Sequence, residues 1–263
     1  MRLPWGRGAI IVGTIVAACA VALPAAADGS APLLPDLDPI APSAVGAQAA
    51  TDGSGRVYLT FTFTLDNKGA GPMVLRGHRA STAEPTMTAD QVIRNVDGTE
   101  TVVPAVGQLE WLPTTGYRRW GFRHQRYELL DTNGAQVGTA ATVGLCMQDD
   151  RNSPGPALPG EPPSKVFLGG CGKNKPNLLS LDLGLSVGWR NLHSAGRLGQ
   201  LIDVTALPSG EYMLVVRVNA DGALSESDTA NNAASARVSI TWIDGQALPA
   251  IAVLATCPNS ATC

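Results

Sequence analysis

The chain has 263 residues and a formal net charge of −3, from 19 basic and 22 acidic side chains. This weakly acidic balance, without a long basic cluster, argues against a nucleic-acid-binding protein. The length is sufficient for one substantial hydrophobic core, or for a domain with a tail. Abundant Ala and Gly beside few Lys favour a GC-rich bacterial genome as the source.

The N-terminus has the organisation of a secretory signal peptide. Two arginines precede an apolar run over residues 9–23, and a small-residue cleavage site follows at Ala25–Ala27. We expect residues 1–27 to be removed, which leaves 17 basic and 22 acidic residues and a net charge of −5. The apolar run is short for a membrane-spanning helix and no later segment is long enough, so we expect no membrane span.

A lipoprotein signal is the alternative reading of this segment. The sequence Val-Ala-Ala-Cys that ends at Cys19 is similar to a lipobox, which would place a lipid anchor on that cysteine. The apolar run continues past Cys19, and this favours ordinary secretion. Both readings predict an exported protein.

Four cysteines remain after cleavage, and their even number in an exported chain favours two disulfides over free thiols or zinc. We expect Cys146 to pair with Cys171 and close a Gly/Pro-rich loop. Cys257 and Cys263 would then close the C-terminal tail. Neither pair has the spacing of a zinc knuckle.

Strand patterns dominate the remaining sequence. Apolar residues alternate strictly with polar ones over Val57–Leu65, which predicts a strand with one face on a core. Asp97-Gly98 and Asn133-Gly134 have the composition of tight hairpin turns. Two more strands are expected at Glu211–Val218 and Ala236–Trp242.

These patterns predict an all-β protein, most simply a β-sandwich over residues 28–245 with a tail at 246–263. Helical periodicity is nearly absent, and we expect at most one helical turn, at Thr88–Arg94. The Pro- and Gly-rich segment Asp149–Ser180 is expected to be a long irregular loop.

Several motifs occur in a particular order along the chain. They are Leu34–Leu37 (LPDL), Tyr127–Asp131 (YELLD) followed by Cys146, Gly184–Trp189 (GLSVGW), Gly199–Thr205 (GQLIDVT), Pro208–Leu214 (PSGEYML) and Glu226–Asn232 (ESDTANN). In this order they resemble the catalytic domain of the lysyl oxidases. The resemblance extends from about Pro32 to Trp242 and implies a β-sandwich of lysyl oxidase type with long loops. Lysyl oxidases oxidise the ε-amine of peptidyl lysine to an aldehyde, using copper and lysine tyrosylquinone, a quinone built from one lysine and one tyrosine.

The histidines that bind copper in this family alternate just before the YELLD-like strand. The equivalent positions here are Tyr117, Arg119 and Gly121. A guanidinium has no lone pair for copper and glycine has no side chain, so we interpret these positions as a vacated copper site. The remaining histidines lie in separate segments: His78, His124 and His193.

The quinone positions are also occupied by other residues. The resemblance places the lysine at Thr142 and the tyrosine at His193. We therefore expect copper and lysine tyrosylquinone to be absent, and a non-catalytic relative of lysyl oxidase. The alternative is an active copper-dependent amine oxidase with a rebuilt site, in which the scattered histidines converge.

A polar loop offers a different metal site. It places four side-chain oxygens within seven residues: Glu226, Asp228, Asn231 and Asn232. A set made only of oxygen ligands suits calcium. The resemblance adds Asp36 and the carbonyl of Leu37 to this set. The alternative is that Asp and Asn only form turns here.

Two weaker patterns complete the analysis. Gly184–Gly188 has the form G-x-S-x-G, which would make Ser186 the nucleophile of a serine hydrolase, but strands surround it instead of alternating β/α units. A cluster of four arginines, Arg118, Arg119, Arg123 and Arg126, reads as a solvated face, or as a site for an acidic glycan, polyphosphate or partner carboxylate. We thus expect a binding or structural module whose partner is a cell-surface glycan or protein.

Overall fold

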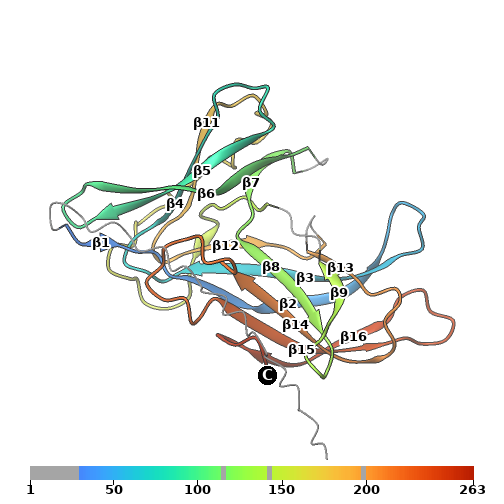
Figure 1. Cartoon of the computed structure of the whole chain (residues 1–263). Helices are drawn as coiled ribbons and strands as arrows, with labels where there is room; N and C mark the ends of the chain where they lie inside the picture. Colours follow the sequence, from blue (N-terminus) through green and yellow to red (C-terminus); the bar gives the residue numbers. More distant parts are fainter. Residues whose placement is uncertain (1–29, 114–116, 141–143, 197–199) are drawn as a thin grey trace, which may run out of the picture.

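The computed structural model describes residues 30–113, 117–140, 144–196 and 200–263. These residues form sixteen strands in two antiparallel sheets and no helix, which confirms the all-β prediction (Figure 1). The expected signal peptide, Cys19 and Thr142 lie outside the described residues. No described segment is a helix long and apolar enough to cross a bilayer.

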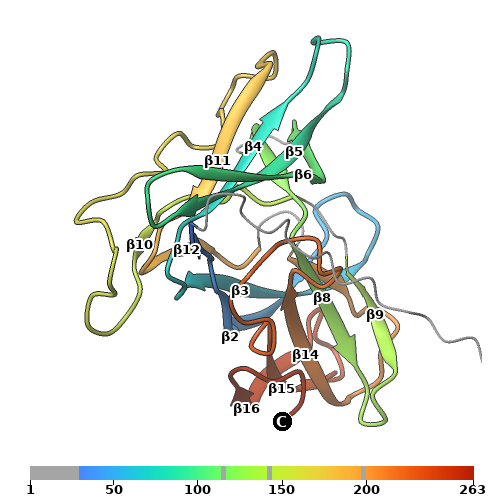
Figure 2. The ribbon, with the colours of Figure 1, turned by 60° about the vertical axis from the view of Figure 1, so that its left-hand side comes forward.

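The smaller sheet has six strands within the described residues and lies above the larger one (Figures 1 and 2). Its order is β11-β4-β5-β6-β7, with β1 paired to β5. The strands are β1 (Pro32–Leu33), β4 (Met73–His78), β5 (Thr86–Asn95), β6 (Glu100–Leu112), β7 (Arg119–Phe122) and β11 (Ser180–Leu185).

The larger sheet has ten strands within the described residues, in the order β10-β12-β3-β13-β9-β8-β14-β15-β16, with β2 paired to β3. The strands are β2 (Leu37–Ala49), β3 (Val57–Asn67), β8 (Gln125–Leu130), β9 (Gln136–Ala140), β10 (Arg151–Asn152), β12 (Trp189–His193), β13 (Leu201–Asp203), β14 (Gly210–Val218), β15 (Ala233–Thr241) and β16 (Ala250–Cys257). The sheet curls so that β2 contacts β14, β15 and β16. Its two halves thereby enclose a core.

The alternating pattern of β3 supplies the centre of this core. Leu59, Phe61, Phe63 and Leu65 are all fully buried. The rings of Phe61 and Phe63 meet the ring of Tyr127 edge-on, with centroids 5.0 and 5.6 Å apart. Burial of such side chains stabilises a fold by roughly 1.5–3 kcal/mol each, so β3 and β8 anchor the two halves of the large sheet to each other.

The hairpin turns form where the sequence predicts them. Gly98 joins β5 to β6 with φ +85°, and Gly134 joins β8 to β9 with φ +81°, values that glycine adopts without a steric penalty. The expected helical turn at Thr88–Arg94 is wrong, because this segment belongs to β5. It pairs with β4 on one side and β6 on the other, and this pairing outweighs a weak local preference.

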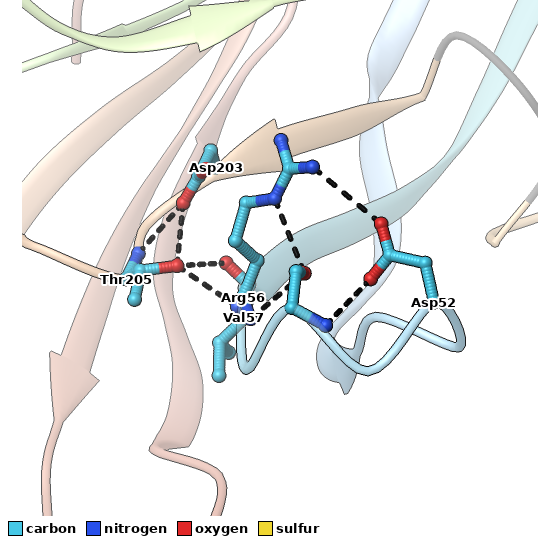
Figure 3. Close-up of polar contacts among 6 residues, drawn as sticks. Asp52, Arg56, Val57, Asp203 and Thr205 are labelled. Atoms are coloured by element: carbon cyan, nitrogen blue, oxygen red, sulfur yellow. Dashed lines mark hydrogen bonds and ion pairs between the residues drawn. The ribbon is translucent and has the colours of Figure 1, made fainter.

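The connection between β2 and β3 is tied to the end of β13 by a polar network (Figure 3). The backbone N–H of Val57 donates to Thr205 Oγ1 at 2.9 Å, and Thr205 Oγ1 donates to Asp203 Oδ1 at 2.6 Å. Arg56 reaches Asp52 across the loop at 3.5 Å. These contacts satisfy the backbone at the end of the hairpin.

Both expected disulfides form. Cys146 and Cys171 are buried, with Cα atoms 5.6 Å apart, and Cys257 and Cys263 have Cα atoms 5.4 Å apart. The long segment between residues 149 and 180 is irregular apart from the two-residue strand β10. The C-terminal segment contributes β16, which pairs with β15, before the second disulfide closes it.

Candidate functional site

The segment that the sequence predicts to be a vacated copper site corresponds to β7 and the residues before it. β7 belongs to the small sheet, whereas the YELLD-like strand β8 belongs to the large sheet. Tyr117 is buried, and its hydroxyl accepts a hydrogen bond from the Cys146 N–H at 2.9 Å. The Arg119 guanidinium lies 5.6 Å from the centre of the Tyr117 ring and 4.0 Å from Cys146 Sγ. These two side chains thus pack around the buried disulfide.

The third copper position is filled by backbone. A Cβ atom added to Gly121 would lie 2.6 Å from the carbonyl carbon and oxygen of Gly144, and a Cβ on Gly144 would meet Gly121 at the same distance. Phe122 and Leu145 exchange two backbone hydrogen bonds of 3.0 Å beside this contact. No side chain fits at Gly121 without moving one of these strands. The residues at the three matched positions therefore do not fit copper.

The residue at the quinone tyrosine position is a packed histidine. The His193 ring is buried and stacks on Phe63, with centroids 6.2 Å apart. Its Nε2 lies 2.8 Å from Asn191 Oδ1. A side chain held by these contacts is part of the core of the large sheet.

The three described histidines do not converge on a common point. His78 is exposed on β4 and lies 3.1 Å from Asp90. His124 packs against Phe63, as His193 does, with centroids 6.5 Å apart. Within the described ranges, no group of three or more His, Cys, Asp or Glu side chains is placed to hold a metal ion.

His124 is buried just after the end of β7, next to the Phe122 backbone. Its Nδ1 lies 3.1 Å from the Phe122 carbonyl oxygen, and its Nε2 is buried without a hydrogen-bond partner. Burial lowers the pKa of His124 to about 4, although the Phe122 carbonyl acts in the opposite direction. The imidazole is therefore neutral at physiological pH.

The predicted calcium loop connects β14 to β15 and lies against the start of β2. The Glu226 carboxylate is its centre. It accepts hydrogen bonds from the Leu37 N–H at 2.7 Å, from Asn219 Nδ2 at 2.7 Å and from Asn232 Nδ2 at 3.0 Å. Burial raises the pKa of Glu226 to about 7, and these hydrogen bonds partly oppose the rise.

The other predicted ligands lie around Asp36. Asn231 Nδ2 donates to Asp36 Oδ1 at 2.7 Å, and burial raises the pKa of Asp36, with the nearby Asp228 charge adding to the rise. Asp228 is exposed and accepts from the Ala230 N–H at 2.8 Å. Asn231 Oδ1 and Asn232 Oδ1 are buried without hydrogen-bond partners. These two amide oxygens without partners lie near the carboxyl groups of Asp36 and Glu226, whose pKa values are raised. The arrangement is compatible with a bound cation, although no group of three described Asp or Glu side chains is placed there to hold one.

Sequence reasoning missed two residues that hold this loop. Asn219, with φ +45°, donates from Nδ2 to the Leu224 carbonyl and to Glu226, and its Oδ1 accepts from the Leu224 N–H. Gln91 of β5 bonds the backbone of Ser225 from the other sheet. The position of Asn219 between a strand and an Asp-Gly turn is a usable local signal. No local signal identifies Gln91.

Ser186 lacks the surroundings of a nucleophile. It is buried, and its hydroxyl donates to Asp149 Oδ2 at 2.8 Å while its N–H donates to Asp149 Oδ1 at 2.9 Å. The same Asp149 carboxylate accepts from the N–H groups of Val166 and Phe167. The Ser–Asp pair therefore fixes the long loop against β11, and it contains no general base for a hydrolase.

The arginine cluster seen in the sequence divides in the structure. Arg119 is half-buried beside the disulfide, and Arg123 pairs with Glu110 at 3.0 Å. Arg126 pairs with the exposed Asp221 at 2.9 Å. A cleft of about 440 Å³ lies beside Arg123 and Arg126, between β6 and the turn that follows β14.

Comparison with models of protein families identifies the family of this chain. The family model described as lysyl oxidase matches residues 78–247, which is more than half of the chain. The chain therefore belongs to the lysyl oxidase family. A search of curated protein sequences gives no match.

Proposed function

We propose that this member of the lysyl oxidase family is exported, does not oxidise amines and acts as a calcium-stabilised binding or structural module at the cell surface. The observation that carries the proposal is the contact between Gly121 and Gly144, which leaves no room for a ligand side chain at the third copper position. Tyr117 and Arg119 at the other two positions pack around the buried disulfide. These contacts support the proposal that the three matched positions do not hold a catalytic copper ion.

The test is copper loading with an activity readout. The secreted protein is incubated with Cu²⁺, dialysed and assayed for bound metal, for quinone staining and for hydrogen peroxide released from a lysine-containing peptide. We expect neither stoichiometric copper nor amine-dependent peroxide. Copper at one equivalent together with peroxide release would contradict the proposal.

An amine oxidase with a rebuilt site is the second candidate. It is favoured by one observation, the buried Nε2 of His124 that has no hydrogen-bond partner, because a neutral imidazole is a good copper ligand. This candidate requires that peroxide release disappears in both His124→Ala and His193→Ala. The exposed His78→Ala would serve as the matched control.

Calcium is proposed as a structural ion at the loop between β14 and β15. The supporting observations are the two orphaned oxygens of Asn231 and Asn232 and the carboxylates of Asp36 and Asp228. Chelated protein should gain thermal stability when Ca²⁺ is added, and Asp228→Asn should reduce that gain. Asp244→Asn, an exposed acid in another turn, is the control. An equal gain in wild type and Asp228→Asn would reject this site.

Export is supported by the two disulfides and by the signal-peptide pattern. We propose a secreted or cell-surface protein whose mature chain begins at Asp28. N-terminal sequencing of protein from the culture medium tests this. A lipid-modified N-terminus at Cys19 would instead identify a lipoprotein.

A further inference from the structure

Two clefts adjoin on either side of the turn Asn219–Gly222, and the first of them lies between this turn and β6 of the small sheet. The first, of about 440 Å³, is bordered by Arg123, Arg126 and Asp221. The second, of about 520 Å³, is bordered by Arg126, Arg217, Thr229 and Asn232. Arg126, Asn219 and Ala220 line both clefts, so the turn separates two halves of one continuous site.

Two arginines face each other at the junction. Arg126 on β8 and Arg217 on β14 are direct partners in the strand register. Like charges directly opposite each other on neighbouring strands are unfavourable, and an anion between them removes the repulsion. Arg217 is neutralised by Glu128, at 3.0 Å, and the Glu128 side chain is only 14% exposed. Arg126 has a weaker partner, because the Asp221 side chain is 84% exposed.

The Arg126–Asp221 ion pair is therefore easily exchanged. The Arg126 side chain is itself 49% exposed, and an ion pair between two exposed groups contributes little to stability. A ligand carboxylate can replace Asp221 on the guanidinium and form two parallel hydrogen bonds there. The site thus has a cation available at the centre of two polar clefts.

The residues that line the clefts indicate the chemical character of the ligand apart from its carboxylate. Apart from the charged residues, among which Glu110 is already paired with Arg123, the clefts offer amide, hydroxyl and imidazole groups, with the apolar side chains of Phe122, Leu224 and several smaller residues between them. Such a surface suits a ligand with many hydroxyl groups better than an apolar one. Each cleft has the volume of a small-molecule site. Because Arg126, Asn219 and Ala220 line both clefts, the two together form a groove.

We propose that this groove binds an acidic glycan, with a uronate carboxylate on Arg126 and neighbouring sugars in the two clefts. The inference rests on the proposed function as a binding module and names the class of its ligand. The loop that carries Thr229 and Asn232 is also the proposed calcium loop, so the second cleft includes residues of that loop. Glycan binding needs no redox chemistry.

The test measures binding of trigalacturonate to the mature secreted protein by titration calorimetry. Arg126→Gln should weaken binding at least tenfold, and Ala220→Trp, which fills the junction from an exposed position, should abolish it. Arg56→Gln is the matched control, because its side chain is 51% exposed and also pairs with an aspartate. Maltotriose, which has no carboxylate, should bind at least tenfold more weakly than trigalacturonate.

Three outcomes would overturn the inference. They are no binding of trigalacturonate, equal binding of maltotriose, and unchanged affinity in both Arg126→Gln and Ala220→Trp. Tripolyphosphate that binds as tightly as trigalacturonate would also overturn it, because the site would then recognise an anion without the sugar. Failure here leaves the copper and peroxide results unaffected, so it is distinguishable from failure of the proposed loss of catalysis.

Discussion

Gln91 forms a reciprocal pair of hydrogen bonds with the backbone of Ser225. Its Oε1 accepts from the Ser225 N–H at 2.8 Å, and its Nε2 donates to the Ser225 carbonyl at 2.8 Å. Gln91 lies on β5 of the small sheet and is fully buried, whereas Ser225 lies in the loop between β14 and β15. The Gln91 side chain thus links the small sheet to the loop that carries the proposed calcium ligands.

Replacing Gln91 should therefore destabilise the protein. Gln91→Met keeps the approximate shape but leaves the Ser225 N–H and carbonyl unsatisfied, and each buried unsatisfied group costs about 1–3 kcal/mol. We expect a loss of about 3 kcal/mol in the free energy of unfolding, measured by urea denaturation. The exposed Gln108→Met should change it by less than about 0.5 kcal/mol. Equal effects of the two substitutions would show that the bond pair is not stabilising.

A side chain at Gly121 should be poorly tolerated. In Gly121→Ala the new Cβ would lie 2.6 Å from Gly144, so the strands must separate, and we expect a loss of about 2–4 kcal/mol. Gly169→Ala is the control, because no atom lies within 4 Å of a Cβ there. A thermal melt that is unchanged in Gly121→Ala would mean that the two glycines are not in contact.

Glu226 should make stability depend on pH in calcium-free buffer. Its folded pKa of about 7 lies above its ordinary value of 4.5, so its contribution is fully present below pH 4.5. As pH rises towards and through 7, the unfolded chain releases the proton first, and the free energy of unfolding falls by up to about 3 kcal/mol. Glu226→Gln cannot lose a proton. Its stability relative to wild type should therefore rise between pH 5 and 8, as followed by urea denaturation in EDTA.

His124 should have the opposite dependence. Burial lowers its pKa from 6.5 to about 4, so the folded state binds fewer protons than the unfolded state between these values. Its contribution is present above pH 6.5 and is lost as pH falls towards 4, by up to about 3 kcal/mol. His124→Phe keeps an aromatic ring and should remove this acid sensitivity, whereas the exposed His78→Phe should not. An identical acid transition in wild type and His124→Phe would contradict the prediction.

The two titrations act in opposite directions between pH 4.5 and 6.5. Wild type alone will therefore show a shallow profile in that range, because each group offsets the other. Only the difference between each variant and wild type isolates one group. The additivity of the two effects can be checked in the double variant.

Features that depend on residues close together in the chain could be predicted from the sequence. The alternation of β3, the Asp97-Gly98 and Asn133-Gly134 turns and the even cysteine count are local or covalent properties, and the motifs around Gly184–Trp189 indicated the family. The segment Thr88–Arg94 failed as a helical turn because its two neighbouring strands are distant in sequence. The local secondary-structure preference of a segment does not include the neighbouring strands that pair with it only in the folded protein.

Contacts between residues that are distant in sequence, in contrast, depend on how the whole chain folds. The approach of Gly121 to Gly144, the bonds from Gln91 to Ser225 and the pairing of Arg126 with Arg217 each join a strand to a segment that is distant in sequence. Four neighbouring arginines in the sequence suggested one basic patch, but Arg119 lies on β7 of the small sheet and Arg126 on β8 of the large sheet, and only Arg123 and Arg126 line the first cleft. Side chains two residues apart on a strand lie on the same face of that strand, which the sequence reveals. The residues that pack against this face are set by the fold of the whole chain. The residues at the positions matched to the copper ligands are thus readable from the sequence, whereas the backbone contact between Gly121 and Gly144 is a property of the fold.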